Sequence, residues 1–332
     1  MLAENKFGTG ANIGREDLRD FEYKAGAAPF DWVKGFDIEA KLGFKLPVKD
    51  QNGSGSCGGQ AFAYYGSVLE ALATGTFEER SAKFIYSQSF TPPWGSSGRD
   101  NCKVVTKQGW AKESVLPSYE SINGVQTPPS EAFMQRSGDI TDEVRKDALR
   151  AKSLSYYTVD TDIETVAHAI ESGNGIVLGI TGENNGTWLS AFPKVAENES
   201  WRHWVYAGKA KMIDGKKYIG FINSWGNIGE NGWQWIGEEW FNGRWVWNAW
   251  TLIYDAQIKH IFNLDMKFGD QNEEVKFLQV RLQDLNFFPK NQTCTGFYGN
   301  VTKDAVRNYA MSNMLSVTGK IVGPTIRRFL NK

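Results

Sequence analysis

The sequence predicts an α+β fold with two lobes, one helical and one built of antiparallel β-strands, followed by a separate module of three helices. Three features of the chain lead to this prediction. A long helical pattern begins at Cys57, short β-rich runs fill residues 201–254, and a second helical texture begins after about Asn263. A helical half and a β half in one domain form packed lobes, and the cleft between lobes is a common place for a site.

The composition supports one large and one small domain. The chain has 332 residues, of which 41% are hydrophobic, enough to bury both cores. We predict an N-terminal extension at 1–28, a large domain at 29–260 and a helical domain at 264–332. The extension is rich in glycine, alanine and charge without sustained periodicity, and the sequence leaves open whether it covers the cleft.

Helix and strand signals follow one another in the large domain. The run CGGQAFAYYGSVLEALA predicts a helix from Cys57 to about Ala73, because apolar residues recur at helical spacing and Thr74-Gly75 is a stop signal. IETVAHAIES, at about 163–172, predicts a second helix. The runs WVYAG, KYIGFINSW, GWQWI and WTLIYD, separated by Gly, Asn and Asp turns, predict an antiparallel sheet.

The charge balance excludes several partner classes. The net charge is −1, which argues against a nucleic-acid or anionic-membrane partner. No apolar run approaches the roughly 18 residues that a membrane-spanning helix needs, and the N-terminus lacks the apolar segment of a secretory signal. We therefore expect a soluble protein without a membrane span that is made in the cytoplasm.

Few groups are available for nucleophilic catalysis or metal binding. An odd number of cysteines cannot form a full disulfide framework, and the histidines are scattered. The complete set is Cys57, Cys102, Cys294, His168, His203 and His260. We expect no metal and no cofactor, because zinc sites need closely spaced ligands.

Cys57 differs from the other cysteines because it stands at the predicted start of a helix, after Gly55-Ser56. There the helix dipole and free backbone N–H groups lower the pKa of a thiol. Gln51, six residues earlier, carries an amide that could donate to an oxyanion. The alternative is that Cys57 is a small buried apolar residue, which is the usual role of a lone cysteine.

Two segments of the large domain carry distinctive motifs. In PVKDQNGSGSC a glutamine precedes the cysteine by six residues, and in RHWVYAGKAKMIDGKKYIGFINSWGNIGENGWQWI a histidine opens a strand and Asn-Ser-Trp-Gly closes a hairpin. Both segments resemble the papain family of cysteine peptidases. The resemblance implies a papain-like two-lobed domain in which Cys57 is the nucleophile, His203 its acid/base partner and Asn223 the residue that orients the imidazole. It also implies that Gln51 donates to the oxyanion and that Trp225 shields the Asn223–His203 hydrogen bond from water.

The chain departs from this family at several positions. Ser54 and Gly58 stand where the family usually has a disulfide cysteine and a tryptophan. We therefore expect a reducing compartment and, at Gly58 and Gly59, an emptier cleft floor. Too few residues precede Gln51 for the family's usual inhibitory prosegment. The residues expected to be non-catalytic are His168, His260, Cys102 and Cys294.

Residues 264–332 resemble peptidoglycan-binding modules. The segments GDQNEEVKFLQVRLQDLNFF, TGFYGNVTKDAVRNYA and LSVTGKIVGPTIRRFL predict three helices, with Thr302 and Pro324 near two of the starts. A net charge of +4 in this region fits contact with an anionic polymer, and ordinary surface scatter is the alternative. Any small three-helix module shows similar spacing. The predicted core consists of Val275, Leu278, Leu282, Ala305 and Ile326.

Together the resemblances imply a cysteine endopeptidase that hydrolyses amide bonds through a Cys57 acyl-enzyme and is directed to the bacterial cell wall by its C-terminal module. The implied substrate is peptidoglycan, as for a bacteriophage endolysin, with delivery by lysis or in a virion. Two alternatives stay open. One is a wall-anchored or virion-associated protease that cuts proteins, and the other is a non-catalytic wall-binding or structural protein.

Overall fold

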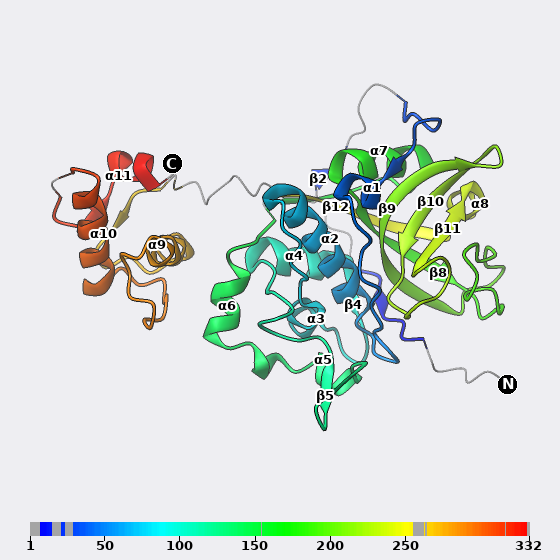
Figure 1. The fold of residues 1–332 in the computed structure, drawn as a ribbon, viewed down its shortest axis with the longest axis horizontal. Coiled ribbons are helices and arrows are strands. Elements are labelled where there is room, and N and C mark those ends of the chain that lie inside the picture. The colour runs from blue at the N-terminus through cyan, green and yellow to red at the C-terminus, as the bar shows by residue number, and fades with distance from the viewer. Residues whose placement is uncertain are drawn as a thin grey trace. The chain divides into compact units, whose positions relative to one another are not determined.

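The computed structural model describes residues 7–14, 21–23, 29–153, 155–254, 262, 264–315 and 317–330. The chain divides into two compact units, Met1–Asp255 and Ala256–Lys332. The first contains both helices and an extensive sheet, and the second is mainly helical (Figure 1). The predicted order of an α+β fold followed by a small helical module is confirmed.

A helical lobe of the first unit is built around α2 (Cys57–Thr74), which is buried along most of its length. The helix ends where Gly75 adopts the left-handed conformation, with φ 74°, as the sequence signal indicates. Helices α3 and α4 pack against α2. The other elements of this region are β1 (Ala11–Asn12), α1 (Ile38–Leu42), α3 (Ala82–Ser89), β4 (Ser96–Ser97), α4 (Gly98–Lys107), β5 (Glu120–Ile122), β6 (Val125–Thr127), α5 (Glu131–Met134), a 3-10 turn (Ser137–Asp139) and α6 (Asp142–Ala148).

The other lobe is an eight-stranded sheet in the order β11-β10-β9-β8-β12-β7-β2, with β3 beside β9. Its neighbours pair antiparallel, except that β2 and β7 are parallel. The strands are β2 (Phe21–Glu22), β3 (Phe36–Asp37), β7 (Ser155–Thr158), β8 (Ile176–Gly182), β9 (Trp201–Ile213), β10 (Lys216–Ile222), β11 (Trp233–Gly237) and β12 (Val246–Ile253). Helices α7 (Ile163–Gly173) and α8 (Glu238–Asn242) accompany the sheet (Figure 1).

Two apolar clusters support these lobes. One surrounds α2 and includes Phe62 and Val68, and the other lies between the sheet and α7 and includes Ile170 and Phe221, all fully buried. Full burial of such a side chain contributes about 1.5–3 kcal/mol. Because α2 also packs against β9, the helix that begins at Cys57 and the strand that carries His203 are parts of one packed domain.

The second unit consists of α9 (Glu273–Asp284), α10 (Asn300–Ser312) and α11 (Pro324–Leu330), joined by a two-stranded sheet of β13 (Met266–Lys267) and β14 (Ile321–Val322). The three predicted helices are present, and the small sheet was not predicted. The five predicted core residues, Val275, Leu278, Leu282, Ala305 and Ile326, are all buried. Gln279 is buried among them and bonds to Phe297 O, Thr302 Oγ1 and Gly296 N.

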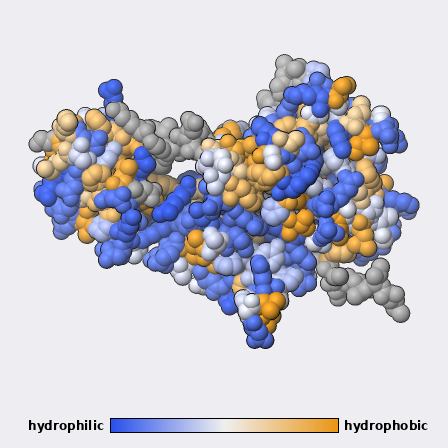
Figure 2. All heavy atoms as spheres, in the orientation of Figure 1, coloured by the Kyte–Doolittle hydropathy of each residue, from blue (hydrophilic) through white to orange (hydrophobic). Residues whose placement is uncertain are grey.

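The surface is of mixed polarity. Figure 2 shows hydrophilic residues interspersed with smaller apolar areas on the face in view. Within the described ranges, no helix combines the length and the apolar character needed to cross a membrane.

Candidate active site

The loop before α2 positions Cys57. Ser54 Oγ donates to Gln51 O at 2.7 Å and lies 2.7 Å from Ser56 Oγ, which closes the loop on itself. Gly55 N donates to Glu131 Oε2 at 2.6 Å, and this bond ties the loop to α5. Cys57 is therefore the first residue of a helix whose approach is fixed by hydrogen bonds, as the sequence predicts.

The expectation of an emptier cleft floor at Gly58 and Gly59 is wrong. A Cβ on Gly58 would collide with the Asn101 side chain and lie 2.5 Å from Ser96 Oγ. A Cβ on Gly59 would lie 2.5 Å from Ala82 O. Neighbouring chain already fills this space, so these glycines permit close packing and leave no room for a larger side chain.

His203 and Asn223 meet at the edge of the sheet lobe. His203 lies near the start of β9, and Asn223 immediately follows β10, its antiparallel neighbour. His203 Nε2 lies 2.9 Å from Asn223 Oδ1. Trp225 stacks on the imidazole with ring centroids 4.3 Å apart and an interplanar angle of 29°. The tryptophan thus covers the ring that forms this hydrogen bond.

Gln234 was not predicted from the sequence, although it determines how the Asn223 amide is oriented. Asn223 Nδ2 donates to Gln234 Oε1 at 2.8 Å, while Gln234 Nε2 donates to Trp188 O at 2.8 Å and Ser190 O at 2.9 Å. Gln234 is fully buried. Because its own amide is held by two carbonyl groups, it keeps the oxygen of Asn223 towards His203. The available signal was a lone polar residue in the otherwise apolar run GWQWI.

Gln51 lies beside the Cys57 loop, and both the nitrogen and the oxygen of its side-chain amide form hydrogen bonds. Its Nε2 donates to Ser54 O at 2.7 Å and to Gly8 O at 3.1 Å, and its Oε1 accepts from Ser224 Oγ at 2.5 Å. Its backbone N–H also donates to Ser224 O at 2.8 Å. Residues 51 and 224 thus link the Cys57 loop to the Asn223 segment.

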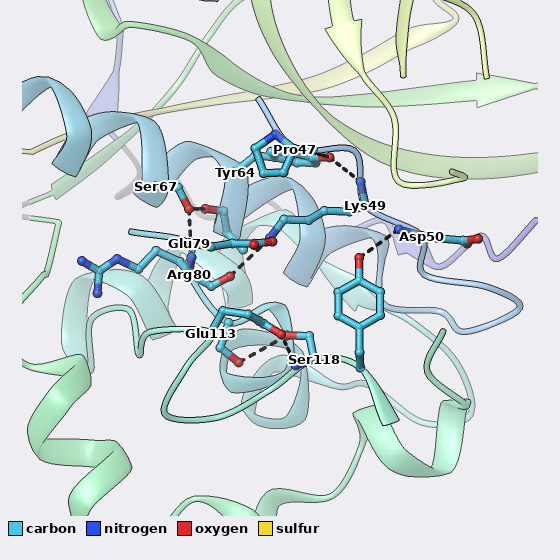
Figure 3. Close-up of polar contacts among 12 residues, drawn as sticks. Pro47, Lys49, Asp50, Tyr64, Ser67, Glu79, Arg80, Glu113 and Ser118 are labelled. Carbon is cyan, nitrogen blue, oxygen red and sulfur yellow. Dashed lines mark hydrogen bonds and ion pairs between the residues drawn. The ribbon is translucent and has the colours of Figure 1, made fainter. Parts of the chain in front are cut away.

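A buried polar network holds the chain just before Gln51 (Figure 3). Lys49 Nζ lies 3.0 Å from Glu79 Oε1 and donates to Arg80 O at 3.3 Å, and Lys49 is only 2% exposed. Lys49 N donates to Tyr64 OH at 2.9 Å, while Tyr64 OH donates to Pro47 O at 2.8 Å. The network anchors the segment to α2, and so fixes the position of the backbone just before Gln51.

Residues of the N-terminal extension lie on the site. Gly8 O accepts from Gln51 Nε2 and from Trp225 Nε1 at 2.8 Å. Further along, β1 pairs in parallel with β4, and Ser96 N donates to Gly10 O at 2.9 Å. The question left open by the sequence is thereby answered: part of residues 1–28 covers the cleft. Cys57 and His203 are each 0% exposed in this arrangement.

Burial controls the protonation of the candidate pair. It raises the pKa of Cys57 to about 12, against the opposing effect of backbone N–H groups of Trp204, Gly58 and Gly10. It lowers the pKa of His203 to about 4, although the hydrogen bond to Asn223 raises it. The expected lowering of the thiol pKa at the helix start is therefore outweighed by burial. At neutral pH the covered site holds a neutral thiol and a neutral imidazole.

The remaining cysteines and histidines lie elsewhere. Cys102 is buried in α4, Cys294 is buried in the second unit, and no cysteine is in a disulfide. His168 is on α7, with its ring 6.1 Å from that of Phe30. His260 lies outside the described residues. In the described part of the chain, no group of three or more His, Cys, Asp and Glu could hold a metal ion.

Known proteins share both parts of this architecture. Residues 271–330 match the family model of a peptidoglycan binding domain. Xylellain, a cysteine protease from Xylella fastidiosa, has a TM-score of 0.61 and 24% identity, over 75% of this chain and 97% of that chain. Procathepsin B S9 from Trypanosoma congolense has a TM-score of 0.57 and 14% identity, over 75% and 87%. Comparison with curated protein sequences gives no match.

A third solved structure, digestive procathepsin L 3 of Tenebrio molitor larval midgut, has a TM-score of 0.54 and 16% identity, over 75% of this chain and 76% of that chain. The first unit therefore has the papain-like fold, and the chain joins it to a segment that matches a peptidoglycan binding domain. The resemblance stated from the sequence motifs is confirmed in both parts.

Proposed function

We propose that this protein is a thiol peptidase directed to peptidoglycan, with Cys57 as its nucleophile. The observation that carries the proposal is the constellation at the lobe junction of a papain-like fold. It combines a cysteine at a helix start, a histidine bonded to an asparagine, and a glutamine amide beside the cysteine loop. The segment at 271–330 that matches a peptidoglycan binding domain supports the choice of polymer.

The chemistry follows from the geometry. Among the described residues His203 Nδ1 has no hydrogen-bond partner, while Nε2 is engaged by Asn223, so Nδ1 is the nitrogen available to take the proton of Cys57. The thiolate adds to the scissile carbonyl, and Gln51 Nε2 with the Cys57 N–H stabilises the oxyanion. His203 returns the proton to the leaving amine. Water then attacks the thioester, with His203 as base, and releases the acid and free Cys57.

Asn223, Gln234 and Trp225 support this cycle by holding and covering the imidazole of His203. Asn223 holds the imidazole in one orientation, and Gln234 holds Asn223. Trp225 covers the imidazole face, which keeps water from competing for the Asn223 bond. We propose positioning roles for all three.

The second unit offers a basic hollow for an anionic polymer. A cavity of about 580 Å³ is lined by Lys267, Phe268, Asn300, Lys303, Lys320 and Ile321. Lysine ammonium groups attract the carboxylates of peptidoglycan stem peptides, and the apolar side chains suit the lactyl and alanyl methyl groups between them. Tethering the enzyme to the polymer raises the local concentration of cleavable bonds.

Purified sacculi test both parts of the proposal. The wild type should bind sacculi and release new free amines, whereas Cys57→Ala should bind equally and release none. Lys267→Gln combined with Lys320→Gln should weaken binding about tenfold, while Lys290→Gln, on an exposed loop of the same unit, should not. Equal amine release by wild type and Cys57→Ala, or none by either, would end the peptidase proposal.

The nature of the substrate is tested separately. The solved structures named above are called cysteine protease or procathepsin, so a protein substrate is the rival to peptidoglycan. Casein and sacculi digested side by side, with the Cys57→Ala variant as blank, distinguish the two. Cleavage of casein faster than of sacculi would argue for the wall-anchored protease. We propose that the protein acts at the bacterial wall, as an endolysin does that is released by lysis or carried by a virion.

A further inference from the structure

Glu131 is the first residue of α5, and its side chain is bonded into the surroundings of the candidate active site. We propose that Glu131, acting with Tyr86 of α3, is a positioning residue for Cys57. The two side chains join the loop before Cys57 to the loop that leads into β4, and they are here called the Glu131–Tyr86 bridge. This inference rests on the proposed function of Cys57 as a nucleophile.

The first argument is that one carboxylate connects the two loops. Glu131 Oε2 accepts from Gly55 N at 2.6 Å, and Glu131 Oε1 accepts from Tyr86 OH at 2.7 Å. Tyr86 OH in turn accepts from Gly95 N at 3.1 Å. The bridge therefore runs from Gly55, two residues before Cys57, to Gly95, the residue before β4.

The second argument is that Gly55 also contacts the proposed nucleophile. The Cys57 thiol donates to Gly55 O, with the sulfur 3.9 Å from the oxygen. The residue whose N–H is bonded to Glu131 is thus the residue whose carbonyl is bonded to the thiol. Glu131 does not touch the sulfur, so its effect on Cys57 passes through Gly55.

The third argument is that the other end of the bridge contacts the strand that carries the imidazole. Ser96, which follows Gly95, accepts at its backbone O from Trp204 Nε1 at 3.0 Å. Trp204 follows His203 in β9. The bridge therefore links the backbone beside the thiol to a segment that is bonded to the histidine strand, and the relative position of these two groups decides whether a proton can pass between them.

The fourth argument is steric, because the parts of the bridge meet closely. A Cβ on Gly55 would lie 2.8 Å from Tyr86 OH and 3.0 Å from Gly95 N. The elements that carry these groups pack together, since α3 contacts both α5 and β4 (Figure 1). The glycine thus lets the loop before Cys57 approach Tyr86 directly.

The bridge also suits a loop that has no covalent link. Ser54 stands where the papain family usually has a disulfide cysteine, and all three cysteines of this chain are free. A carboxylate forms stronger hydrogen bonds than a neutral acceptor does. Gln135 Nε2 donates to Glu131 Oε1 at 2.5 Å, which further orients this carboxylate.

The kinetic experiment uses the full-length protein and peptides released from sacculi. Glu131→Ala removes the acceptor of both bonds, so kcat should fall about thirtyfold, with KM within about twofold of the wild type because the bridge does not contact the substrate. Glu131→Gln keeps the volume and one acceptor oxygen, so it should recover kcat to about fivefold below the wild type. Tyr86→Phe, which removes the link to Gly95, should also lower kcat about fivefold.

Asp147 provides a matched control. Its Oδ2 accepts from Lys112 N at 2.7 Å, which is the same kind of bond from a carboxylate to a loop N–H in the same lobe. Asp147→Asn exchanges a carboxylate for an amide, as Glu131→Gln does, but the bond concerned does not lead to Cys57. Its kcat should stay within about twofold of the wild type.

A second measurement does not depend on catalysis. Amide hydrogen exchange followed by NMR should be at least about tenfold faster at the Gly55 N–H in Glu131→Ala than in the wild type, and about threefold faster at the Gly95 N–H. Asp147→Asn should leave both rates unchanged. If Glu131→Ala does not fold, Glu131→Gln and Tyr86→Phe decide the question, because both keep the size of the side chain.

The outcomes separate the bridge from the proposed reaction. Faster exchange at both glycines together with a lower kcat and an unchanged KM supports the positioning role. Faster exchange with a wild-type kcat, or an equal loss of kcat in Asp147→Asn, overturns that role while the peptidase stands. Unchanged exchange at Gly55 overturns the bridge itself. A wild type that releases no amines from sacculi overturns the peptidase, and the exchange rates then decide the bridge alone.

Discussion

Replacing His203 with glutamine should change how the stability of the protein depends on pH. Burial lowers the pKa of His203 from 6.5 to about 4 in the folded protein. Above about pH 6.5 the imidazole is neutral in both the folded and the unfolded state, so it does not make stability depend on pH there. Below that value the unfolded chain binds a proton that the folded protein refuses, so the folded state loses stability until the pH reaches about 4. The shift corresponds to a loss of about 3 kcal/mol.

Urea denaturation at intervals from pH 7.5 to pH 4 measures this loss. Over that range the free energy of unfolding of the wild type should fall about 3 kcal/mol more than that of His203→Gln. Carboxylates such as Glu39, whose pKa is lowered by its bonds to Lys209 despite burial, titrate in both proteins and cancel from the difference. Parallel curves for wild type and His203→Gln would refute the assignment of a buried, neutral imidazole.

Three further substitutions, one of them with a matched control, test the supports of the site and of the second unit. Gln234→Met removes one hydrogen bond from Asn223, so kcat on sacculus peptides should fall about tenfold with KM unchanged, and an unaltered kcat would reject the positioning role. Lys49→Met breaks a largely buried ion pair and should lower the free energy of unfolding by about 2–3 kcal/mol, whereas Lys112→Met, in a half-exposed pair, should cost less than about 1 kcal/mol. Gln279→Leu removes three hydrogen bonds of the second unit, including the one that the buried Gly296 N–H donates, and should abolish sacculus binding while alkylation of Cys57 by iodoacetamide stays at the wild-type rate.

Local sequence patterns were sufficient to predict the elements whose contacts join residues close together along the chain. The helix from Cys57 to the Gly75 stop, the helix before Asn174 and the three helices of the second unit all follow from apolar spacing and end signals. The hairpin that carries Asn223 follows from its turn residues and alternation. The two helices of the large domain begin where they were predicted and end within one residue of the prediction, because their hydrogen bonds join residues that are close along the chain.

Within the candidate site, the motif order identified Cys57, His203, Asn223 and Gln51, and the fold brings all four to the lobe junction. The sequence could not supply Gln234, because its role depends on which strand lies beside Asn223. Nor could it supply the surroundings of Gly58, because Asn101, which packs against this glycine, belongs to another helix.

What the sequence alone determined is therefore the main helices and the antiparallel strands of the large domain, the identity of the candidate nucleophile, and the presence of a second unit. Only the tertiary structure decided that part of the N-terminal extension covers the cleft and that burial outweighs the helix dipole at Cys57. The physical reason is the same in both cases. Gly8 meets Gln51 and Trp225 across 43 and 217 residues of chain, and burial depends on every segment that packs around a group, so neither is encoded in a local pattern.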